Sequence, residues 1–185
     1  MILRTSYFNQ LLQLRDQDLI KVVTGIRRCG KSTLLHAFKQ HLVTDGVAAD
    51  AICFLNFEER ENAHFQSWEQ VYDFIIGNLS AAAKRYVLLD EVQLIPQFEK
   101  LVDALYVKKD IDLYITGSNA YLLSSELSTM LSGRYIAINL HPFSFAEYVT
   151  AFPEVSDMGK LFRQYMNGSC FPESVTLSKV APEQE

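Results

Sequence analysis

Hydrophobic and polar residues alternate along this chain in two kinds of segment. Short runs that are rich in β-branched and aromatic residues and have no polar face predict buried strands, and they are Leu19–Thr24, Ala51–Phe57, Arg85–Leu89, Ile111–Thr116 and Tyr135–Leu140. Apolar residues at intervals of three and four predict helices over Lys31–Thr44, Trp68–Leu79, Phe98–Lys108, Ala120–Leu131, Ser144–Ala151 and Asp157–Met166. Strands separated by helices indicate an α/β fold, with a parallel sheet and helices on both faces.

A glycine-rich loop joins the first predicted strand to the first predicted helix. Its residues fit the phosphate-binding pattern G-x-x-x-x-G-K-[ST], and they are Gly25, Ile26, Arg27, Arg28, Cys29, Gly30, Lys31 and Ser32. Phosphate binding is favoured there because unpaired backbone N–H groups meet the positive end of a helix dipole. Lys31 would reach the β- and γ-phosphates of a nucleotide, and the Ser32 hydroxyl would bind Mg²⁺. This loop and the adjacent Thr33 form the candidate nucleotide-binding segment.

A second motif ends the third predicted strand, where Asp90 and Glu91 follow an apolar run. Adjacent acids are costly in a buried segment unless a cation or a phosphate site uses them. Asp90 would hold Mg²⁺ directly or through water, and Glu91 would orient or activate an attacking water molecule. Gln93 could contact the same water or the neighbouring strand. An exposed strand end and an ordinary strand-turn-helix are the alternatives, but two motifs in this order favour a nucleotide site.

Two later positions carry further candidate chemistry. Ser118 and Asn119 follow the fourth predicted strand, and ligands of open α/β sheets bind at the carboxyl ends of strands. Either side chain could hydrogen-bond the γ-phosphate or the attacking water, and the same pair could cap the helix that begins near Ala120. Arg134 precedes the last strand, and its planar guanidinium suits the charge of a transferring phosphoryl group. An ordinary surface arginine is the alternative at that position.

The composition narrows the class of protein. The chain has 185 residues, of which 49% are hydrophobic and 21% charged, as in an ordinary globular domain. A net charge of −5 argues against a surface that coats nucleic acid. No apolar run approaches the roughly 18 residues of a membrane span, and no secretory signal is evident. Three cysteines without metal-ligand spacing make a reducing cytoplasm the simplest setting. Among them, Cys29 is read as a tolerated small residue, with a redox-sensitive thiol as the alternative.

Together these motifs resemble the AAA_14 ATPases, a branch of the AAA+ superfamily that is often joined to a DUF4143 C-terminal domain. The double arginine inside the phosphate loop is distinctive of that group. So are the segments LDEVQ at 89–93, TGSN at 116–119, LSGR at 131–134 and LHPFSFAEY at 140–148. The resemblance spans about Arg4 to Ser174. It departs from the family at Ser169 and Cys170, where a Gly-Gly pair usually precedes Phe-Pro-Glu.

The resemblance implies an additional-strand P-loop NTPase core of the AAA+ type, with five parallel strands in the order 5-1-4-3-2, that binds ATP and Mg²⁺. It implies that Ser118 or Asn119 serves as sensor 1, and that Arg134 is a candidate arginine finger, in its own site or a neighbour's. We assign residues 1–174 to the ATPase core and residues 175–185 to a polar, disordered tail. The helical lid and C-terminal domain of relatives are expected to be absent from this chain.

The leading functional hypothesis is an enzyme that hydrolyses Mg-ATP to ADP and phosphate and thereby drives a conformational change. The alternative is a nucleotide-dependent switch or binding module with little hydrolysis. A P-loop kinase fits less well, because the Asp-Glu pair suits attack by water. ATP is the expected ligand, a homo-oligomer and an unidentified protein partner are possible, and neither nucleic acid nor a membrane is supported. Arg27 and Arg28 would face either the phosphates of ATP or a neighbouring subunit.

Overall fold

Five parallel strands form one sheet in this computed structural model, which describes residues 4–118, 131–168, 170–172 and 175. The strands are β1 (Ile20–Gly25), β2 (Ile52–Asn56), β3 (Arg85–Asp90), β4 (Ile111–Thr116) and β5 (Tyr135–Leu140). Their order is β2-β3-β4-β1-β5, with every neighbouring pair parallel. Read from the other edge, this is the predicted order 5-1-4-3-2, so the predicted fold class is confirmed.

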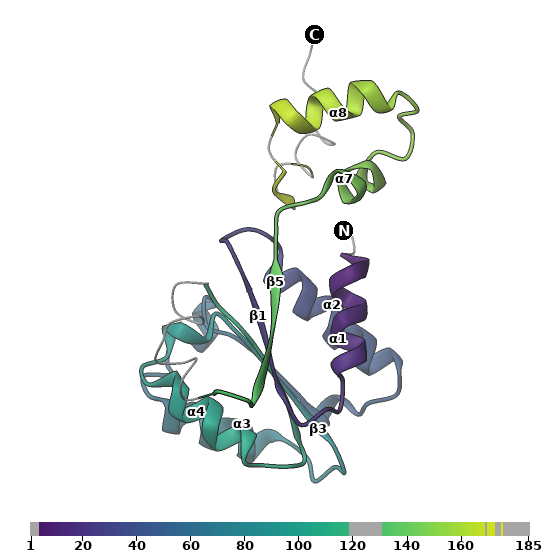
Figure 1. Cartoon of the computed structure of the whole chain (residues 1–185). Coiled ribbons are helices and arrows are strands. Elements are labelled where there is room, and N and C mark those ends of the chain that lie inside the picture. The colour runs from purple at the N-terminus through teal and green to yellow at the C-terminus, as the bar shows by residue number, and fades with distance from the viewer. Residues whose placement is uncertain (1–3, 119–130, 169, 173–174, 176–185) are drawn as a thin grey trace.

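Helices connect the strands and extend the chain beyond β5 (Figure 1). They are α1 (Thr5–Leu14), α2 (Lys31–Thr44), α3 (Trp68–Asn78), α4 (Phe98–Tyr106), α7 (Phe145–Ala151) and α8 (Met158–Asn167), with 3-10 turns η1 (Ala49–Ala51), η2 (Arg60–Asn62) and η3 (Val92–Leu94). Predicted bounds differ by one or two residues at several ends. Ala51, for example, belongs to η1 and not to β2. The helix predicted over Ala120–Leu131 lies outside the described residues, except for the buried Leu131.

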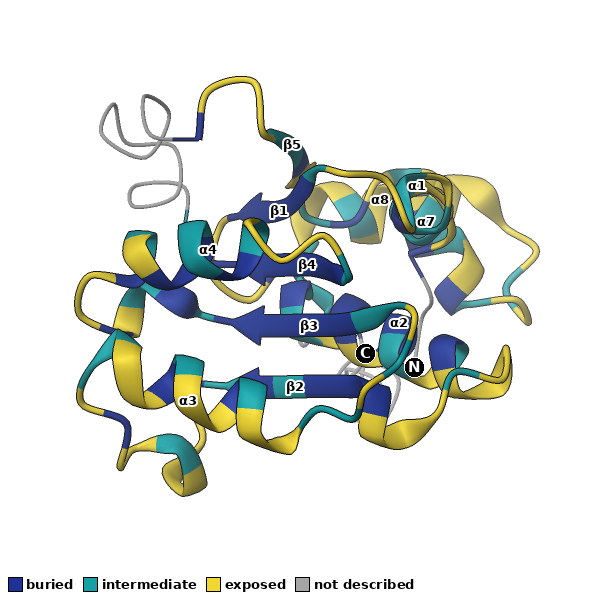
Figure 2. Cartoon of the chain, turned by 90° about the horizontal axis from the view of Figure 1, so that it is seen from below, coloured by how far each residue is buried: buried dark blue, intermediate teal, exposed yellow. Residues whose placement is uncertain are grey.

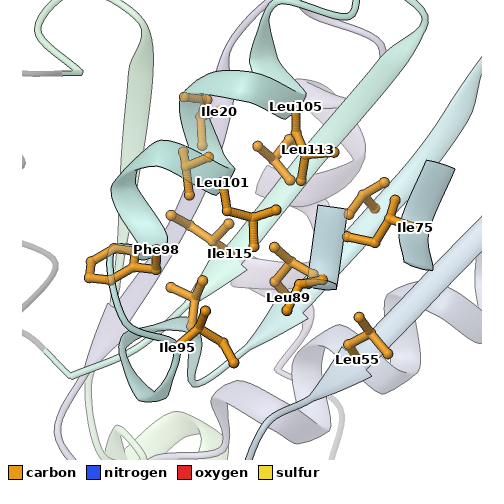
Figure 3. Packing of buried hydrophobic residues seen from close by; sticks show 14 of the residues in the cluster. Ile20, Leu55, Ile75, Leu89, Ile95, Phe98, Leu101, Leu105, Leu113 and Ile115 are labelled. Atoms are coloured by element: carbon orange, nitrogen blue, oxygen red, sulfur yellow. The ribbon is translucent and has the colours of Figure 1, made fainter. Parts of the chain in front are cut away.

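Two hydrophobic clusters fix the layers, one on each face of the sheet. On one face, side chains of α3 and α4 pack against β1, β3 and β4, and Figure 3 shows Ile75, Leu101 and Phe98 among them. On the other face, α1 and α2 cover the sheet, with Leu11 and Phe38 fully buried. Figure 2 shows the central strands buried between these helix layers. The predicted arrangement of helices on both faces is therefore confirmed.

A buried ion pair interrupts the apolar strands at the edge where β1 and β4 begin. Lys21 and Asp112 are both fully buried, and Lys21 Nζ donates a hydrogen bond to Asp112 Oδ1. Tyr114 Oη donates to Asp112 Oδ2 at 2.9 Å, and the backbone N–H of Asp16 donates to the same oxygen at 2.8 Å. Burial lowers the pKa of Lys21, and Asp112 opposes that shift. The charges are tolerated because each is paired and hydrogen-bonded.

Helices α7 and α8 form a small unit beyond the carboxyl end of β5 (Figure 1). Its core contains Phe143, Tyr148 and Leu161. Ser144 caps α7 by accepting from the Glu147 N–H, and Glu147 accepts from the Ser144 N–H at 2.9 Å, which together form a capping box. Asp157 caps the start of α8, and the helix ends at Asn167 with Gly168 as its C-cap, one residue beyond the predicted end. Among the described residues, each helix is too short or too polar to cross a bilayer.

Candidate nucleotide-binding site

The predicted site residues converge because of the strand order. Strand β4 lies between β1 and β3, so the carboxyl ends of these three strands are neighbours at one edge of the sheet. Gly25 ends β1, Asp90 ends β3 and Thr116 ends β4. Parallel sheets of this type bind ligands outside the carboxyl ends of their strands. Chain topology alone therefore brings the glycine-rich loop and the Asp90-Glu91 pair together.

Backbone geometry explains both glycines of the loop. Gly25 has a φ of 151°, and a Cβ there would lie 2.4 Å from the Leu140 carbonyl oxygen and 2.7 Å from Cys29 Sγ. Gly30 has a φ of 97° and is the N-cap of α2, where left-handed geometry suits glycine. Arg28, with a φ of 68°, also adopts left-handed geometry, which is uncommon for a side chain of this size. The loop is thus held in a conformation that places the start of α2 against the sheet edge.

Lys31 lies inside this edge and not in solvent. It is 4% exposed, and its Nζ is 3.4 Å from the Gly25 carbonyl oxygen and 3.3 Å from Glu91 Oε1. The ammonium group therefore connects the phosphate loop to the acidic pair. A buried lysine at the first turn of a helix supplies a positive charge where phosphate oxygens can also reach loop N–H groups.

Asp90 is fully buried, and one of its oxygens has no partner. Thr116 Oγ1 donates a hydrogen bond to Asp90 Oδ1, whereas Asp90 Oδ2 accepts none. Burial raises the pKa of Asp90, and hydrogen bonds from Ser32 and Thr116 oppose that rise. Asp90 thus has an orphaned carboxylate oxygen, and the Ser32 hydroxyl contacts the same residue. Such oxygens suit Mg²⁺, which takes one or two carboxylates and completes its shell with phosphate and water oxygens. These residues fit the predicted ion.

Glu91 is held in a strained backbone conformation next to Asp90. Its φ is 55°, in the left-handed region, and its N–H donates to Thr116 Oγ1 at 3.0 Å. Gln93 Nε2 donates to Glu91 Oε2 at 2.6 Å. Gln93 thus contacts the carboxylate itself, a partner that the sequence analysis does not name for it. Local backbone strain of this kind is concentrated at functional sites, where the surrounding contacts over-determine it.

Thr116 is a site residue that the sequence analysis missed. Its hydroxyl donates to Asp90 Oδ1 and accepts from the Glu91 N–H, so one oxygen orients both members of the acidic pair. Thr116 was predicted as the end of a strand and as the first residue of the segment TGSN, but no role was assigned to its hydroxyl. The signal in the sequence is a hydroxyl at the last position of a buried strand, separated from the candidate sensor Ser118 only by Gly117. Ser118 is half-buried after β4, and Asn119 lies outside the described residues.

The tip of the phosphate loop is exposed, while its base is buried. Ile26, Arg27 and Arg28 are exposed, and Arg27 Nη2 is 3.4 Å from Glu58 Oε1. Cys29 is fully buried, and this burial raises the pKa of its thiol. A buried thiol with a raised pKa is a poor source of reactive thiolate, which favours the small-residue interpretation of Cys29. Thr33 is exposed on the first turn of α2.

Arg134 lies where the strands begin, whereas the phosphate loop of the same chain lies where they end. The Arg134 carbonyl oxygen accepts a hydrogen bond from the N–H of Ile20, the first residue of β1, and the phosphate loop follows Gly25, the last residue of β1. Five steps along a strand correspond to about 17 Å. Arg134 is exposed, and its Nη1 forms an ion pair with Asp103 Oδ1 at 2.9 Å. The structure therefore does not bring Arg134 together with the other candidate residues.

Comparison with known proteins places this site in a family. A family model described as an AAA domain, AAA_14, matches residues 17–149. An uncharacterised protein of Haemophilus influenzae is 41% identical over 179 residues, which cover 95% of this chain and 45% of that protein. An uncharacterised protein of Methanocaldococcus jannaschii is 28% identical over 131 residues, covering 70% of this chain and 28% of that protein. The chain thus spans less than half the length of these relatives.

Two solved structures share the fold. A Walker-type ATPase of Pyrococcus abyssi superposes with a TM-score of 0.59 at 17% identity, over 92% of this chain and 65% of that one. Orc1 of Aeropyrum pernix, solved in complex with DNA, gives 0.57 at 12% identity, over 99% and 62%. Such low identities concern the fold alone. The family model covers more than half of the chain, and its match indicates nucleotide binding. The chain therefore belongs to the AAA_14 family of AAA-type ATPases.

Proposed function

We propose that this chain binds Mg-ATP at the carboxyl edge of its sheet and hydrolyses it to ADP and phosphate, which drives a conformational change. The observation that carries the proposal is the contact between the phosphate loop and the acidic pair, in which Lys31 Nζ lies 3.3 Å from Glu91 Oε1. A cation for phosphate oxygens and a carboxylate for water lie side by side there. Hydrolysis needs both groups within reach of one phosphorus atom.

Each residue has a defined role in this proposal. The loop from Gly25 to Ser32 surrounds the β- and γ-phosphates with backbone N–H groups, and Lys31 neutralises their charge. Ser32 and Asp90 would hold Mg²⁺, which shields the phosphate charge when it is bound. Glu91 orients a water molecule and withdraws its proton. The water oxygen bonds to the γ-phosphorus as the bond to the β-phosphate oxygen breaks, so that ADP leaves with the bonding electrons.

Gln93 and Thr116 position the carboxylate in this scheme. Gln93 Nε2 donates to one Glu91 oxygen at 2.6 Å, and the other oxygen lies near Lys31. Thr116 holds the Glu91 backbone N–H. An attacking water would have to replace Gln93 or Lys31 at the Glu91 carboxylate. ATP binding would draw Lys31 toward the phosphates and so free one Glu91 oxygen to act as a base.

Arg134 is proposed as an arginine finger for a neighbouring copy. Its position about 17 Å along β1 from the loop supports this proposal over a contact with a nucleotide in its own chain. Its exposed guanidinium is available to a partner surface at the cost of the ion pair with Asp103, and exposed ion pairs are weak. We propose a homo-oligomer in which Arg134 reaches the site of the adjacent subunit.

The test of hydrolysis is single-turnover cleavage of Mg-ATP by the wild type and by Glu91→Gln. Loss of a general base should slow cleavage by roughly 10²–10⁴-fold while ATP still binds. The matched control is Glu99→Gln. Glu99 lies in the first turn of α4, and the variant should cleave at the wild-type rate. Equal cleavage by the wild type and Glu91→Gln would show that Glu91 is not the base.

A nucleotide-dependent switch with little hydrolysis is the second candidate. The observation that favours it is the engagement of both Glu91 oxygens, one with Gln93 and one with Lys31. Analysis of the nucleotide that remains bound after long incubation separates the two functions. Accumulated ADP supports the ATPase, and persistent ATP supports the switch.

The proposals for the rest of the chain follow the same reasoning. We propose residues 1–174 as the ATPase core and the cytoplasm as the location of the protein. Val175 is buried in the core of the α7–α8 unit, so the polar tail that was expected over residues 175–185 is proposed to begin after it. Because the relatives are more than twice as long as the matched part, the work that hydrolysis drives belongs to the complete protein. The DNA in the Orc1 structure is a property of Orc1, and the net charge of −5 gives no reason to extend it to this chain.

A further inference from the structure

Arg4 is a buried arginine that none of the proposed catalytic steps uses. It is 4% exposed and directly precedes α1, a helix that the sequence analysis did not predict. Its guanidinium lies 4.7 Å from the ring centre of Tyr7 and 5.0 Å from that of Phe143. A buried guanidinium is costly unless its N–H groups find acceptors. The acceptors that it finds come from three separate segments of the chain.

The first acceptor is the phosphate loop itself. Arg4 Nη1 donates to the Cys29 carbonyl oxygen at 3.1 Å. That carbonyl belongs to the Cys29–Gly30 peptide, and the described residues contain no cis peptide bond. In a planar trans peptide the C=O and N–H point in opposite directions, so Arg4 orients the Gly30 N–H away from itself. Donation to the carbonyl also polarises the peptide and makes its N–H a stronger donor.

The remaining acceptors lie beyond β5. Arg4 Nη1 donates to the His141 carbonyl oxygen at 2.7 Å, just after the strand ends. Arg4 Nε and Nη2 donate to the two carboxylate oxygens of Glu147 at 2.6 and 3.1 Å, a bidentate pair. Glu147 in turn accepts from the N–H of Ser144 at the start of α7. Figure 1 shows the N-terminal end of α1 beside α7, as these contacts require.

We propose that Arg4 is a positioning residue that couples the phosphate loop to α7, so that nucleotide binding at the loop alters the stability of the α7–α8 unit. The proposal rests on the proposed function, because it assumes that the loop binds ATP. A change in the Cys29–Gly30 peptide reaches Glu147 through one rigid guanidinium. Glu147 then transmits it to the cap that holds the first turn of α7.

Contacts at the same place support this coupling. A Cβ built on Gly30 would lie 3.6 Å from Cγ of Pro172, a residue of the segment that follows α8. The backbone N–H of Phe143 donates to the Cys170 carbonyl oxygen at 2.8 Å. The segment after α8 therefore returns to the phosphate loop at the residue that Arg4 orients. Two contacts therefore connect the phosphate loop to the helical unit near Gly30, one through Arg4 and one through Pro172.

The test compares Arg4→Gln with Arg15→Gln in two measurements. Arg15 is the matched control, because it lies at the other end of α1 and bonds Tyr86 Oη and Asp45, far from the loop. Calorimetry measures Mg-ATP affinity, and hydrogen exchange measures protection of the amides of residues 145–151 with and without Mg-ATP. We expect Arg4→Gln to lose roughly 10-fold or more in affinity, the equivalent of one charge-assisted hydrogen bond, and to lose the ATP-dependent protection of α7. Arg15→Gln should keep both.

A second variant distinguishes failure of the coupling from failure of nucleotide binding. The contacts of Glu147 described above are with Arg4 and Ser144, and none is with the loop. We nevertheless expect Glu147→Gln to speed hydrogen exchange at the Gly30 amide without any nucleotide. A wild-type exchange rate at Gly30 in a folded Glu147→Gln protein would overturn the coupling. Wild-type ATP affinity and α7 protection in Arg4→Gln would also overturn it, whereas absence of ATP binding in the wild type overturns the proposed function instead.

Discussion

Lys31 Nζ lies 3.3 Å from Glu91 Oε1, so the Glu91 carboxylate would compete with the phosphates of a nucleotide for the Lys31 ammonium group. Both side chains are largely buried, at 4% and 14% exposure, so water screens the attraction only partly. Phosphate oxygens of ATP must displace the carboxylate from the ammonium group. In the proposed mechanism the ion pair thus opposes ATP binding, although each of its members has a role in hydrolysis.

One consequence is that Glu91→Gln should bind Mg-ATP more tightly than the wild type. Replacing the carboxylate by a neutral amide frees Lys31, and a gain of a few-fold in affinity is expected for a partly buried pair. Equilibrium titration measures the effect under conditions where the wild type does not complete a turnover. Weaker binding by Glu91→Gln would show that the ion pair does not compete with the nucleotide.

The Thr116 hydroxyl should be needed for both stability and hydrolysis. Thr116→Val keeps the volume of the side chain but leaves Asp90 Oδ1 and the Glu91 N–H without their partner. Loss of a buried partner costs about 1–3 kcal/mol of unfolding free energy, which denaturant unfolding measures. Thr116→Ser retains the hydroxyl and should stay within a fraction of that loss. A Val variant as stable as the Ser variant would contradict this role.

The raised pKa of Asp90 predicts that its ionised form, which Mg²⁺ binding requires, lowers the stability of the fold. Burial raises its pKa above the ordinary 3.8, so the folded state binds the proton more tightly than the unfolded state does. Its contribution to stability is therefore largest at low pH and declines as the pH rises from about 3.8 through the folded pKa. Asp90→Asn should raise the melting temperature at pH 7 more than at pH 4.

The same carboxylate should make magnesium binding sensitive to acid. Because Mg²⁺ requires the ionised form, the Mg²⁺ dependence of ATP binding should weaken at a higher pH than an ordinary aspartate would give. Titrations at a series of pH values measure this, and Asp90→Asn should abolish the Mg²⁺ dependence at every pH. A Mg²⁺ dependence that survives the substitution would place the ion elsewhere.

The ion pair between Lys21 and Asp112 should support the fold and not the site. Asp112→Ala leaves the Lys21 ammonium buried without its partner, which typically costs about 3–5 kcal/mol. The double variant Lys21→Met with Asp112→Leu should recover much of that loss, since it removes both charges. Neither should alter ATP affinity, because the pair lies where the strands begin. Reduced affinity in the stable double variant would contradict this separation.

The sequence predicted the elements whose signal is local. The loop from Gly25 to Ser32 and the acids Asp90 and Glu91 are contiguous motifs, and the alternation of strands with helices predicted the parallel sheet. Lys21 shows the limit of this reasoning, because its charge is acceptable in a buried strand only through Asp112, 91 positions away. Propensity and periodicity carry no information about a partner so distant in sequence.

The residues that the sequence analysis missed share that property. Arg4 has acceptors at Cys29, His141 and Glu147, which are up to 143 positions away. Thr116 contacts Asp90, the last residue of β3, and Glu91, which follows it. In both cases the residue type is ordinary at its position, and only the fold shows what it binds. The function of Arg134 was left open between its own site and a neighbour's, and its position where β1 begins is the basis for proposing the neighbour's site.

The central claim is that the glycine-rich loop binds Mg-ATP, and calorimetric titration tests it most directly. The wild type and Lys31→Ala are titrated with Mg-ATP and Mg-GTP, with Lys109→Ala as a control, because Lys109 is exposed and pairs with Asp18. We predict saturable binding of Mg-ATP by the wild type and the control, loss of that binding in Lys31→Ala, and weaker binding of Mg-GTP. Equal binding by the wild type and Lys31→Ala, or no binding by a folded wild type, would contradict the account.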